Sequence, residues 1–159
     1  MENLNFEPAV LALAHKLRTA GVLLAAAESC TGGLIAAACT SVAGSSDWFE
    51  RGFVTYSNDA KTEMLGVPAA LIAAHGAVSE PVARAMVEGA LRHSQATLAV
   101  AVTGIAGPGG AVPGKPVGTV WLAWGTAAGV STELLQLGGD RAAVRAATVA
   151  RALARLNAA

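Results

Sequence analysis

Hydrophobic residues follow two alternating spacings along the chain. Near-helical spacing predicts a first helix over residues 8–19, and an unbroken apolar run predicts a buried strand over 22–27. The same patterns predict helices over 34–40, 59–65, 80–93 and from 140 onward, and strands over 52–56, 97–102, 117–126 and 130–137.

The residues between these segments are typical helix and strand boundaries. Gly21 ends the first helix, Asn58 is the expected N-cap of the helix over 59–65, and Ser79-Glu80-Pro81 is a helix start. Residues 127–129 form a hairpin-sized connection. Helices and strands alternate early and a hairpin comes late. The order predicts an α/β fold, a three-layer α/β/α domain over residues 1–159 with a mixed five-stranded sheet.

Composition narrows the function classes. Of 159 residues, 53% are hydrophobic and 14% charged, and 11 basic and 11 acidic side chains cancel. A net charge of zero argues against a nucleic-acid partner. So low a charge also suggests that another subunit covers part of the surface, which predicts a homo-oligomer, most simply a dimer.

The chain lacks the sequence marks of a membrane or exported protein. No apolar run reaches the roughly 18–20 residues of a membrane span, and the acidic residues 1–7 do not resemble a signal peptide. A cytoplasmic location is the expectation. Cys30 and Cys39 have no partner at metal-ligand spacing, so we expect reduced thiols and no metal site. We also expect no cofactor.

Residues 28–33, Glu-Ser-Cys-Thr-Gly-Gly, follow the first predicted strand. Ligands of open α/β sheets bind at the carboxyl ends of strands. Thr31, Gly32 and Gly33 could admit a phosphate to free N–H groups at a helix start. The alternative is a tight turn whose hydroxyls cap the helix. Spacing alone leaves both interpretations open.

A serine pair and a scarce lysine are the next candidates. Ser45 and Ser46 follow a glycine, a pattern that is usually a turn or an N-cap. The chain has only three lysines, and Lys61 lies just after the strand that contains Tyr56. An amine near apolar walls loses its proton more readily and can then act as a base toward a serine. The alternative is a solvated lysine on a short helix.

Two further segments could bind a ligand. The loop that begins at Thr103 and Gly104 is glycine-rich but is neither a Walker loop nor a dinucleotide fingerprint, so it is either a ligand-binding loop or a long turn. Arg141 stands in the first turn of the last helix, where a cation opposes the macrodipole, with Arg145 on the same face. The pair faces an anion such as a phosphate, or forms surface ion pairs with Asp140 or Glu133.

Several long segments, taken together, resemble the CinA C-terminal domain family. These are residues 27–33, 44–58, 75–80, 102–108 and 115–121, followed by Gly139-Asp140-Arg141 and Arg145. The resemblance covers nearly the whole chain and is to a stand-alone form, without the N-terminal domain of larger CinA proteins. It implies a mixed sheet with one antiparallel strand.

The resemblance also implies an activity. Members hydrolyse the carboxamide of nicotinamide mononucleotide to nicotinic acid mononucleotide and ammonia, in pyridine nucleotide recycling, as metal-free serine/lysine hydrolases. By this likeness Lys61 is the base, Tyr56 supports it, and the nucleophile is Ser46 or Ser29. We place Ser46 first, because its loop leads to the strand that carries Tyr56, with Lys61 just beyond it. Cys30 is a third possibility on chemical grounds. Residues 109–114 depart from the family pattern because they lack its acidic and hydroxyl side chains. A nucleotide-binding or competence-related module without catalysis is the alternative.

Overall fold

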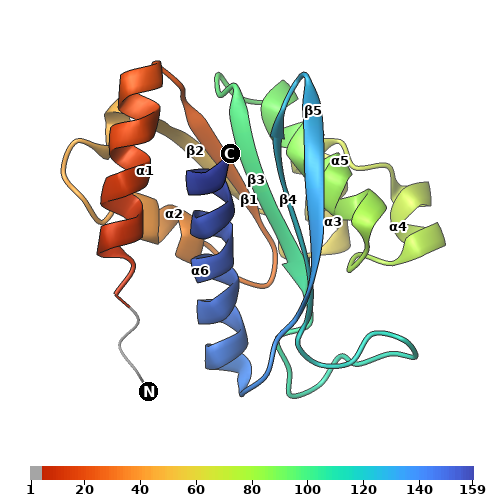
Figure 1. Cartoon of the computed structure of the whole chain (residues 1–159). Coiled ribbons are helices and arrows are strands. Elements are labelled where there is room, and N and C mark those ends of the chain that lie inside the picture. The colour runs from red at the N-terminus through yellow and green to blue at the C-terminus, as the bar shows by residue number, and fades with distance from the viewer. Residues whose placement is uncertain (1–4) are drawn as a thin grey trace.

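The computed structural model describes residues 5–159 as one mixed sheet between two helical layers (Figure 1). Its five strands have the order β2-β1-β3-β4-β5. Parallel pairing joins β1 to β2 and β3, and antiparallel pairing joins β4 to β3 and β5, so β4 alone runs against the other four. The elements are α1 (Glu7–Ala20), β1 (Leu24–Glu28), α2 (Leu34–Cys39), η1 (Ser45–Asp47), β2 (Phe49–Val54), α3 (Asn58–Leu65), α4 (Ala69–His75), α5 (Glu80–Arg92), β3 (Leu98–Gly104), β4 (Thr119–Thr126), β5 (Gly129–Gln136) and α6 (Arg141–Ala158).

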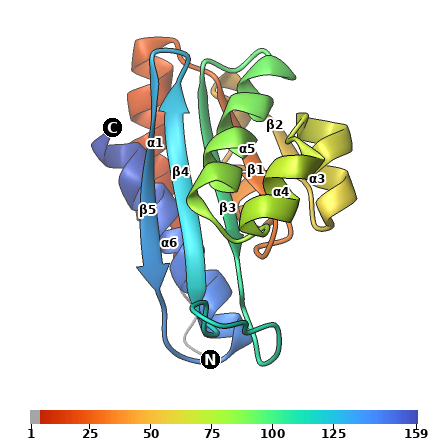
Figure 2. The same ribbon diagram turned by 90° about the vertical axis from the view of Figure 1, so that its right-hand side faces the viewer.

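The side chains of β1 alternate between two separate cores. Leu24 and Ala26 pack into the core shared with α1, α2 and α6, whereas Ala25 and Ala27 pack into the core shared with α3, α4 and α5. The rotated view shows α1 and α6 on one side of the sheet and α3, α4 and α5 on the other (Figure 2). Both faces of the central strands are therefore covered, which explains why β1 is apolar without a polar alternation.

Small side chains let the helical layers approach the sheet closely. β1 has the sequence Leu-Ala-Ala-Ala-Glu, and all five residues are buried. Within one helical layer, Gly89 of α5 lets α3 approach closely, because a Cβ atom there would lie 2.1 Å from the carbonyl oxygen of Leu65. The abundance of alanine and glycine in the sequence thus reflects close packing of layers.

The predicted fold class is confirmed, including the single antiparallel strand. Most element boundaries differ from the predicted ones by one or two residues, and three differences bear on the site or the layers. β2 begins at Phe49, three residues before the predicted strand, and the helix α4 was not predicted. The N-cap of α3 is Ser57 instead of Asn58, because the Ser57 hydroxyl accepts the Ala60 N–H at 3.0 Å. Among residues 5–159, no helix has the length and apolar character to span a membrane.

We expect Leu122→Ala to lower the free energy of unfolding by about 2–5 kcal/mol, because the side chain is fully buried in β4 between the helices and the sheet. Leu134→Ala on β5 is the matched control, since that leucine is 45% exposed and should cost far less. Urea denaturation of both variants measures the difference. Equal losses would contradict the core assignment.

Candidate active site

Three hydroxyl-bearing residues lie side by side where the parallel strands β1, β2 and β3 end. Glu28 pairs with Val54 and with Val102, so the next residues along, Ser29, Thr55 and Thr103, form a row across the sheet. Backbone hydrogen bonds extend the pairing past the ends of β1 and β2. The row continues the face that carries Ala27 and therefore points toward α3 and α5.

Lys61 extends from the first turn of α3 back to this row. Its Nζ atom donates to the Ser29 hydroxyl at 3.0 Å and to the Thr55 carbonyl at 2.8 Å. The carbonyls of Tyr56 and Ser57 lie 3.3 and 3.5 Å from the same atom. The carbonyls belong to the segment that joins β2 to α3, so the connection itself builds a holder for the amine.

The surroundings of Lys61 favour the neutral amine. The residue is 1% exposed, and its hydrogen-bond acceptors are uncharged oxygens. Burial lowers the pKa of Lys61 below its usual value, since an ammonium loses hydration energy there. A neutral amine that touches a serine hydroxyl can accept its proton. The pair Ser29–Lys61 therefore has the geometry of a nucleophile with its base.

Burial has the opposite consequence for the thiol next to Ser29. It raises the pKa of Cys30 to about 11, because the thiolate is the charged form. At neutral pH the thiol is protonated and weakly nucleophilic. Cys30 is thus a poor candidate for the attacking group.

The turn over residues 28–33, called here the Ser29 turn, presents free backbone donors. Gly32 N–H donates to the Ser29 carbonyl at 3.0 Å. The N–H groups of Cys30 and Thr31 donate to no other residue in the part of the chain that the structure describes. Donors of this kind, next to a nucleophile, can stabilise an oxyanion.

The Ser29–Lys61 pair opens into a small cavity of about 220 Å³. Arg141 lies at its rim, where it donates to the Tyr56 hydroxyl at 2.8 Å and to the Gly107 carbonyl at 2.9 Å. The other residues lining the cavity include Asn58, Ala77, Val78, Thr103, Gly104 and Ala106. Arg141 and Ala106 also line an adjoining cavity of about 670 Å³, which reaches Arg145. The two volumes together suit a small-molecule ligand.

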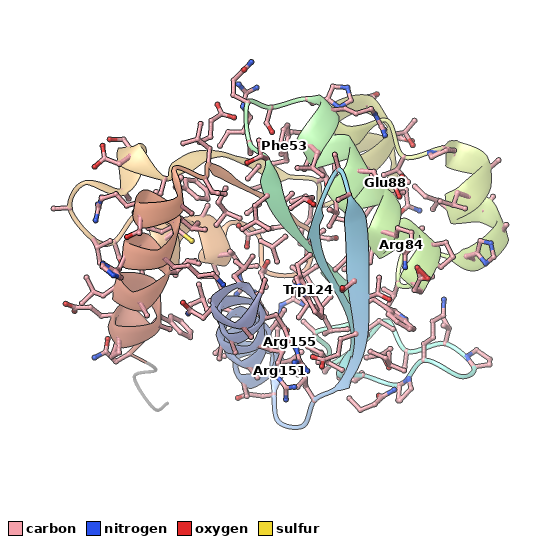
Figure 3. The ribbon with its side chains drawn as sticks, turned by 45° about the horizontal axis from the view of Figure 1, so that its top comes forward. Phe53, Arg84, Glu88, Trp124, Arg151 and Arg155 are labelled. Carbon is pink, nitrogen blue, oxygen red and sulfur yellow. The ribbon has the colours of Figure 1, made fainter. Side chains whose placement is uncertain are left out.

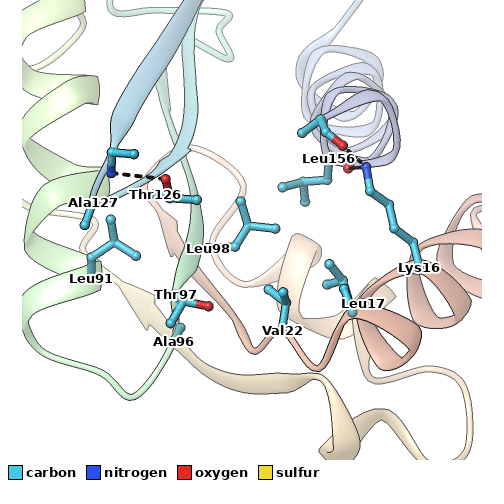
Figure 4. A pocket seen from close by; sticks show the side chains of 13 residues that line it. Lys16, Leu17, Val22, Leu91, Ala96, Thr97, Leu98, Thr126, Ala127 and Leu156 are labelled. Carbon is cyan, nitrogen blue, oxygen red and sulfur yellow. Dashed lines mark hydrogen bonds between the residues drawn. The ribbon is translucent and has the colours of Figure 1, made fainter.

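A third cavity, of about 510 Å³, lies at the amino-terminal ends of β1 and β3 (Figure 4). Its lining is mainly apolar, with residues such as Leu17, Val22 and Leu98. The Lys16 amine there donates to the carbonyls of Leu156 and Asn157 at 3.1 Å each. Neither Ser29 nor Lys61 lines this third cavity.

Comparisons with family models, curated proteins and solved structures all point to one family. The family model described as "CinA C-terminal domain" matches residues 7–159. The chain belongs to the CinA C-terminal domain family. It is 57% identical over 141 residues to a nicotinamide-nucleotide amidohydrolase, PncC, of Pseudomonas putida, covering 89% of this chain and 88% of that protein.

Other family members extend the comparison. This chain covers 32% of a longer "CinA-like protein" of Akkermansia muciniphila, to which it is 59% identical over 83% of its own length. The crystal structure of a competence/damage inducible protein from Agrobacterium tumefaciens superposes with a TM-score of 0.95 at 46% identity, covering 99% of this chain and 98% of that one.

The prediction that Ser46 lies beside Lys61, as nucleophile beside base, is wrong in this fold. Ser46 is an exposed residue of η1, just before β2 begins, whereas Lys61 lies beyond the end of that strand. The two ends are separated by the length of the strand, roughly 15 Å. Ser45 stands in the same 3-10 turn, so neither serine reaches the cavity. Of the two candidate nucleophiles, Ser29 is the one in contact with Lys61.

Some side chains expected to bind substrate instead form hydrogen bonds within the protein. The Thr31 side chain is buried and donates to Glu28, and the Thr103 hydroxyl donates to the Ala77 carbonyl at 2.9 Å. Thr31 therefore offers no side chain to a ligand, although Thr103 and Gly104 do line the cavity. Gly32 and Gly33 have positive φ angles that shape the turn.

The two arginines of α6 behave differently from each other. Arg145 uses Nε and one terminal nitrogen to hold the carbonyls of Cys30 and Thr31, at 3.1 and 3.2 Å. Arg141 holds only the Tyr56 hydroxyl and one carbonyl, and faces both cavities. Neither forms an ion pair with Glu133, which pairs instead with Arg151 and Arg155 near Trp124 (Figure 3).

Sequence reasoning missed Glu28, whose carboxylate is buried beneath the Ser29 turn. A signal was present, since Glu28 is the one acidic residue at the end of an otherwise apolar run over residues 22–27. It also missed Asn58 and Ala106 at the cavity wall. An asparagine in a helix start and an alanine in a glycine-rich loop carry no comparable signal.

Burial of Lys61 predicts a stability that depends on pH. Between its lowered pKa and the usual 10.5, the unfolded chain binds one proton that the folded protein does not. The contribution of Lys61 to the free energy of unfolding should therefore rise with pH in this window, by at most about 1.4 kcal/mol per pH unit, and be level below and above it. Lys61→Met should remove that rise.

Urea denaturation of wild type and Lys61→Met from pH 7 to 10.5 measures the difference. Lys115→Met, on the exposed loop before β4, is the matched control for loss of a lysine. A difference between wild type and Lys61→Met that stays constant with pH would contradict the account of the amine.

Proposed function

We propose that this protein hydrolyses the carboxamide of nicotinamide mononucleotide to nicotinic acid mononucleotide and ammonia, with Ser29 as nucleophile and Lys61 as base. The observation that carries the proposal is the 3.0 Å contact between the Ser29 hydroxyl and the buried Lys61 amine, at the wall of a cavity. The substrate follows from the relative in Pseudomonas putida, which is named for this amide hydrolysis.

The first half of the reaction forms an ester on Ser29. The neutral Lys61 amine takes the hydroxyl proton while the oxygen attacks the carboxamide carbon. The N–H groups of Cys30 and Thr31 are the available donors for the resulting oxyanion. The Lys61 ammonium then gives its proton to the departing nitrogen. The C–N bond breaks, ammonia leaves, and the amine is neutral again.

The second half returns the enzyme to its starting state. A water molecule enters the position that ammonia leaves, and Lys61 removes one of its protons as its oxygen attacks the ester carbon. The intermediate collapses, Ser29 recovers its proton from Lys61, and the acid product departs. One amine serves both halves because each needs a single proton to be taken and returned.

The adjoining cavities can divide the substrate between them. The small cavity beside Ser29 suits a flat aromatic amide, and the larger one, reached past Arg141 and Ala106, suits a ribose phosphate. The guanidinium of Arg141 is tied only to uncharged oxygens, so it can turn to a phosphate without breaking an ion pair. An arginine can bind such a group through two parallel hydrogen bonds.

Ser29→Ala should lower kcat by roughly 10³-fold or more, since loss of a nucleophile leaves only binding and oxyanion stabilisation. Ser46→Ala is the matched control and should retain wild-type turnover, because Ser46 is exposed at the opposite end of β2. Ammonia release from nicotinamide mononucleotide measures both. Loss of activity in Ser46→Ala with retention in Ser29→Ala would reverse the assignment.

Arg141→Ala should raise KM for nicotinamide mononucleotide by about 10- to 100-fold, the effect of losing a charge-assisted hydrogen bond. KM for nicotinamide riboside, which has no phosphate, should change much less. Arg151→Ala removes an exposed arginine of the same helix that pairs with Glu133, and serves as the control. Equal changes for both substrates in Arg141→Ala would show that this arginine does not bind the phosphate.

We also propose that the protein is a homo-oligomer, most simply a dimer. Low charge and exposed apolar side chains, including Leu134 and Val54 on the two edge strands of the sheet, support it. Sedimentation at micromolar concentration distinguishes a dimer from a monomer.

A further inference from the structure

We propose that Glu28 is a positioning residue for the reaction, whose carboxylate holds the Ser29 turn in its reactive geometry. This inference rests on the proposed function of Ser29. The Glu28 side chain does not line either cavity beside Ser29, so it acts through the backbone that it fixes.

The carboxylate accepts hydrogen bonds from both ends of the segment that follows Ser29. Oε1 accepts from the Thr31 hydroxyl at 2.6 Å and from Ile35 N–H at 2.8 Å. Oε2 accepts from Ala36 N–H at 3.0 Å. Glu28 thereby joins the end of β1, the Ser29 turn and the first turn of α2, and it satisfies N–H groups that the helix itself leaves unpaired.

The position of the acid separates its role from that of Lys61. Leu24 and Ala26 precede Glu28 on the face of β1 toward α1, α2 and α6, whereas Ser29 and Lys61 meet on the other face. Glu28 is 1% exposed. Removing a carboxylate from water is unfavourable unless its hydrogen bonds replace hydration, and packing alone would be served by an apolar residue.

Arg145 of α6 holds the same turn by its carbonyls. It donates to the carbonyls of Cys30 and Thr31, the two residues whose N–H groups are free. Arg145 thus fixes the peptide group between Cys30 and Thr31 through its carbonyl, and Glu28 fixes Thr31 through its hydroxyl. Displacement of such groups by about 1 Å can lower a rate by roughly 10²-fold.

Glu28→Gln tests this role with the shape of the side chain preserved. The amide keeps one acceptor oxygen but presents an NH₂ group to one of the donors, so at least one hydrogen bond to the turn or to α2 is lost. We expect kcat to fall roughly 10- to 100-fold while KM changes less than about threefold. Glu88→Gln, at an exposed site on α5 (Figure 3), is the matched control.

A second pair of variants addresses the turn alone, should Glu28→Gln fold poorly. Thr31→Val removes the hydroxyl that Glu28 binds and keeps the shape, whereas Thr31→Ser keeps the hydroxyl. The valine variant should lose kcat, and the serine variant should recover more of it. A role confined to stability would lower the melting temperature in these variants and leave kcat of the folded protein unchanged, which would overturn the proposal.

A readout without substrate separates this inference from the proposed function. The rate at which a fluorophosphonate labels Ser29, followed by intact mass, depends on the nucleophile, its base and its oxyanion donors, and not on nicotinamide mononucleotide. Slower labelling in Glu28→Gln than in Glu88→Gln supports the positioning role even if nicotinamide mononucleotide is not the substrate. Equal rates overturn it while leaving the Ser29–Lys61 pair intact. No labelling of wild type would count against the pair and the inference together.

Discussion

The burial of one amine is the constraint on which the site depends. Lys61 lies against the Ser29 hydroxyl and the carbonyls that link β2 to α3, with 1% of its surface exposed. These oxygens are close enough to hold the amine and carry no net charge to keep it protonated. The result is a lysine whose lowered pKa and fixed position suit proton transfer with a serine.

The sheet supplies the geometry that this contact needs. Because β1, β2 and β3 are parallel, their carboxyl ends meet at one edge, and the register places Ser29 between Thr55 and Thr103. The alanines of β1 bring the helical layers close, so α3 can reach the row with a single side chain. α6 closes the edge with Arg141 at the cavity and Arg145 on the backbone of the Ser29 turn.

Hydrophobic pattern predicted the fold class because periodicity reports burial directly, and the unbroken runs in β1 and β3 are buried on both faces. The pattern did not show which serine lies beside Lys61, because that depends on where β2 begins. A strand over 52–56 leaves Ser46 in a loop of undefined course, whereas the observed start at Phe49 fixes it at the far end of the sheet. Lys61 was predictable because it follows the end of the same strand. The role of Thr31 was not, since it depends on a buried contact with Glu28.

The most direct test of the account is to trap the covalent intermediate. Turnover of nicotinamide mononucleotide can be stopped with acid within milliseconds, and the protein digested and mapped by mass. The account predicts an ester of nicotinic acid mononucleotide on the peptide that contains Ser29, and its absence in Lys61→Met. An adduct on the peptide that contains Ser46, or turnover with no adduct on Ser29 under conditions where ester hydrolysis is rate-limiting, would contradict it.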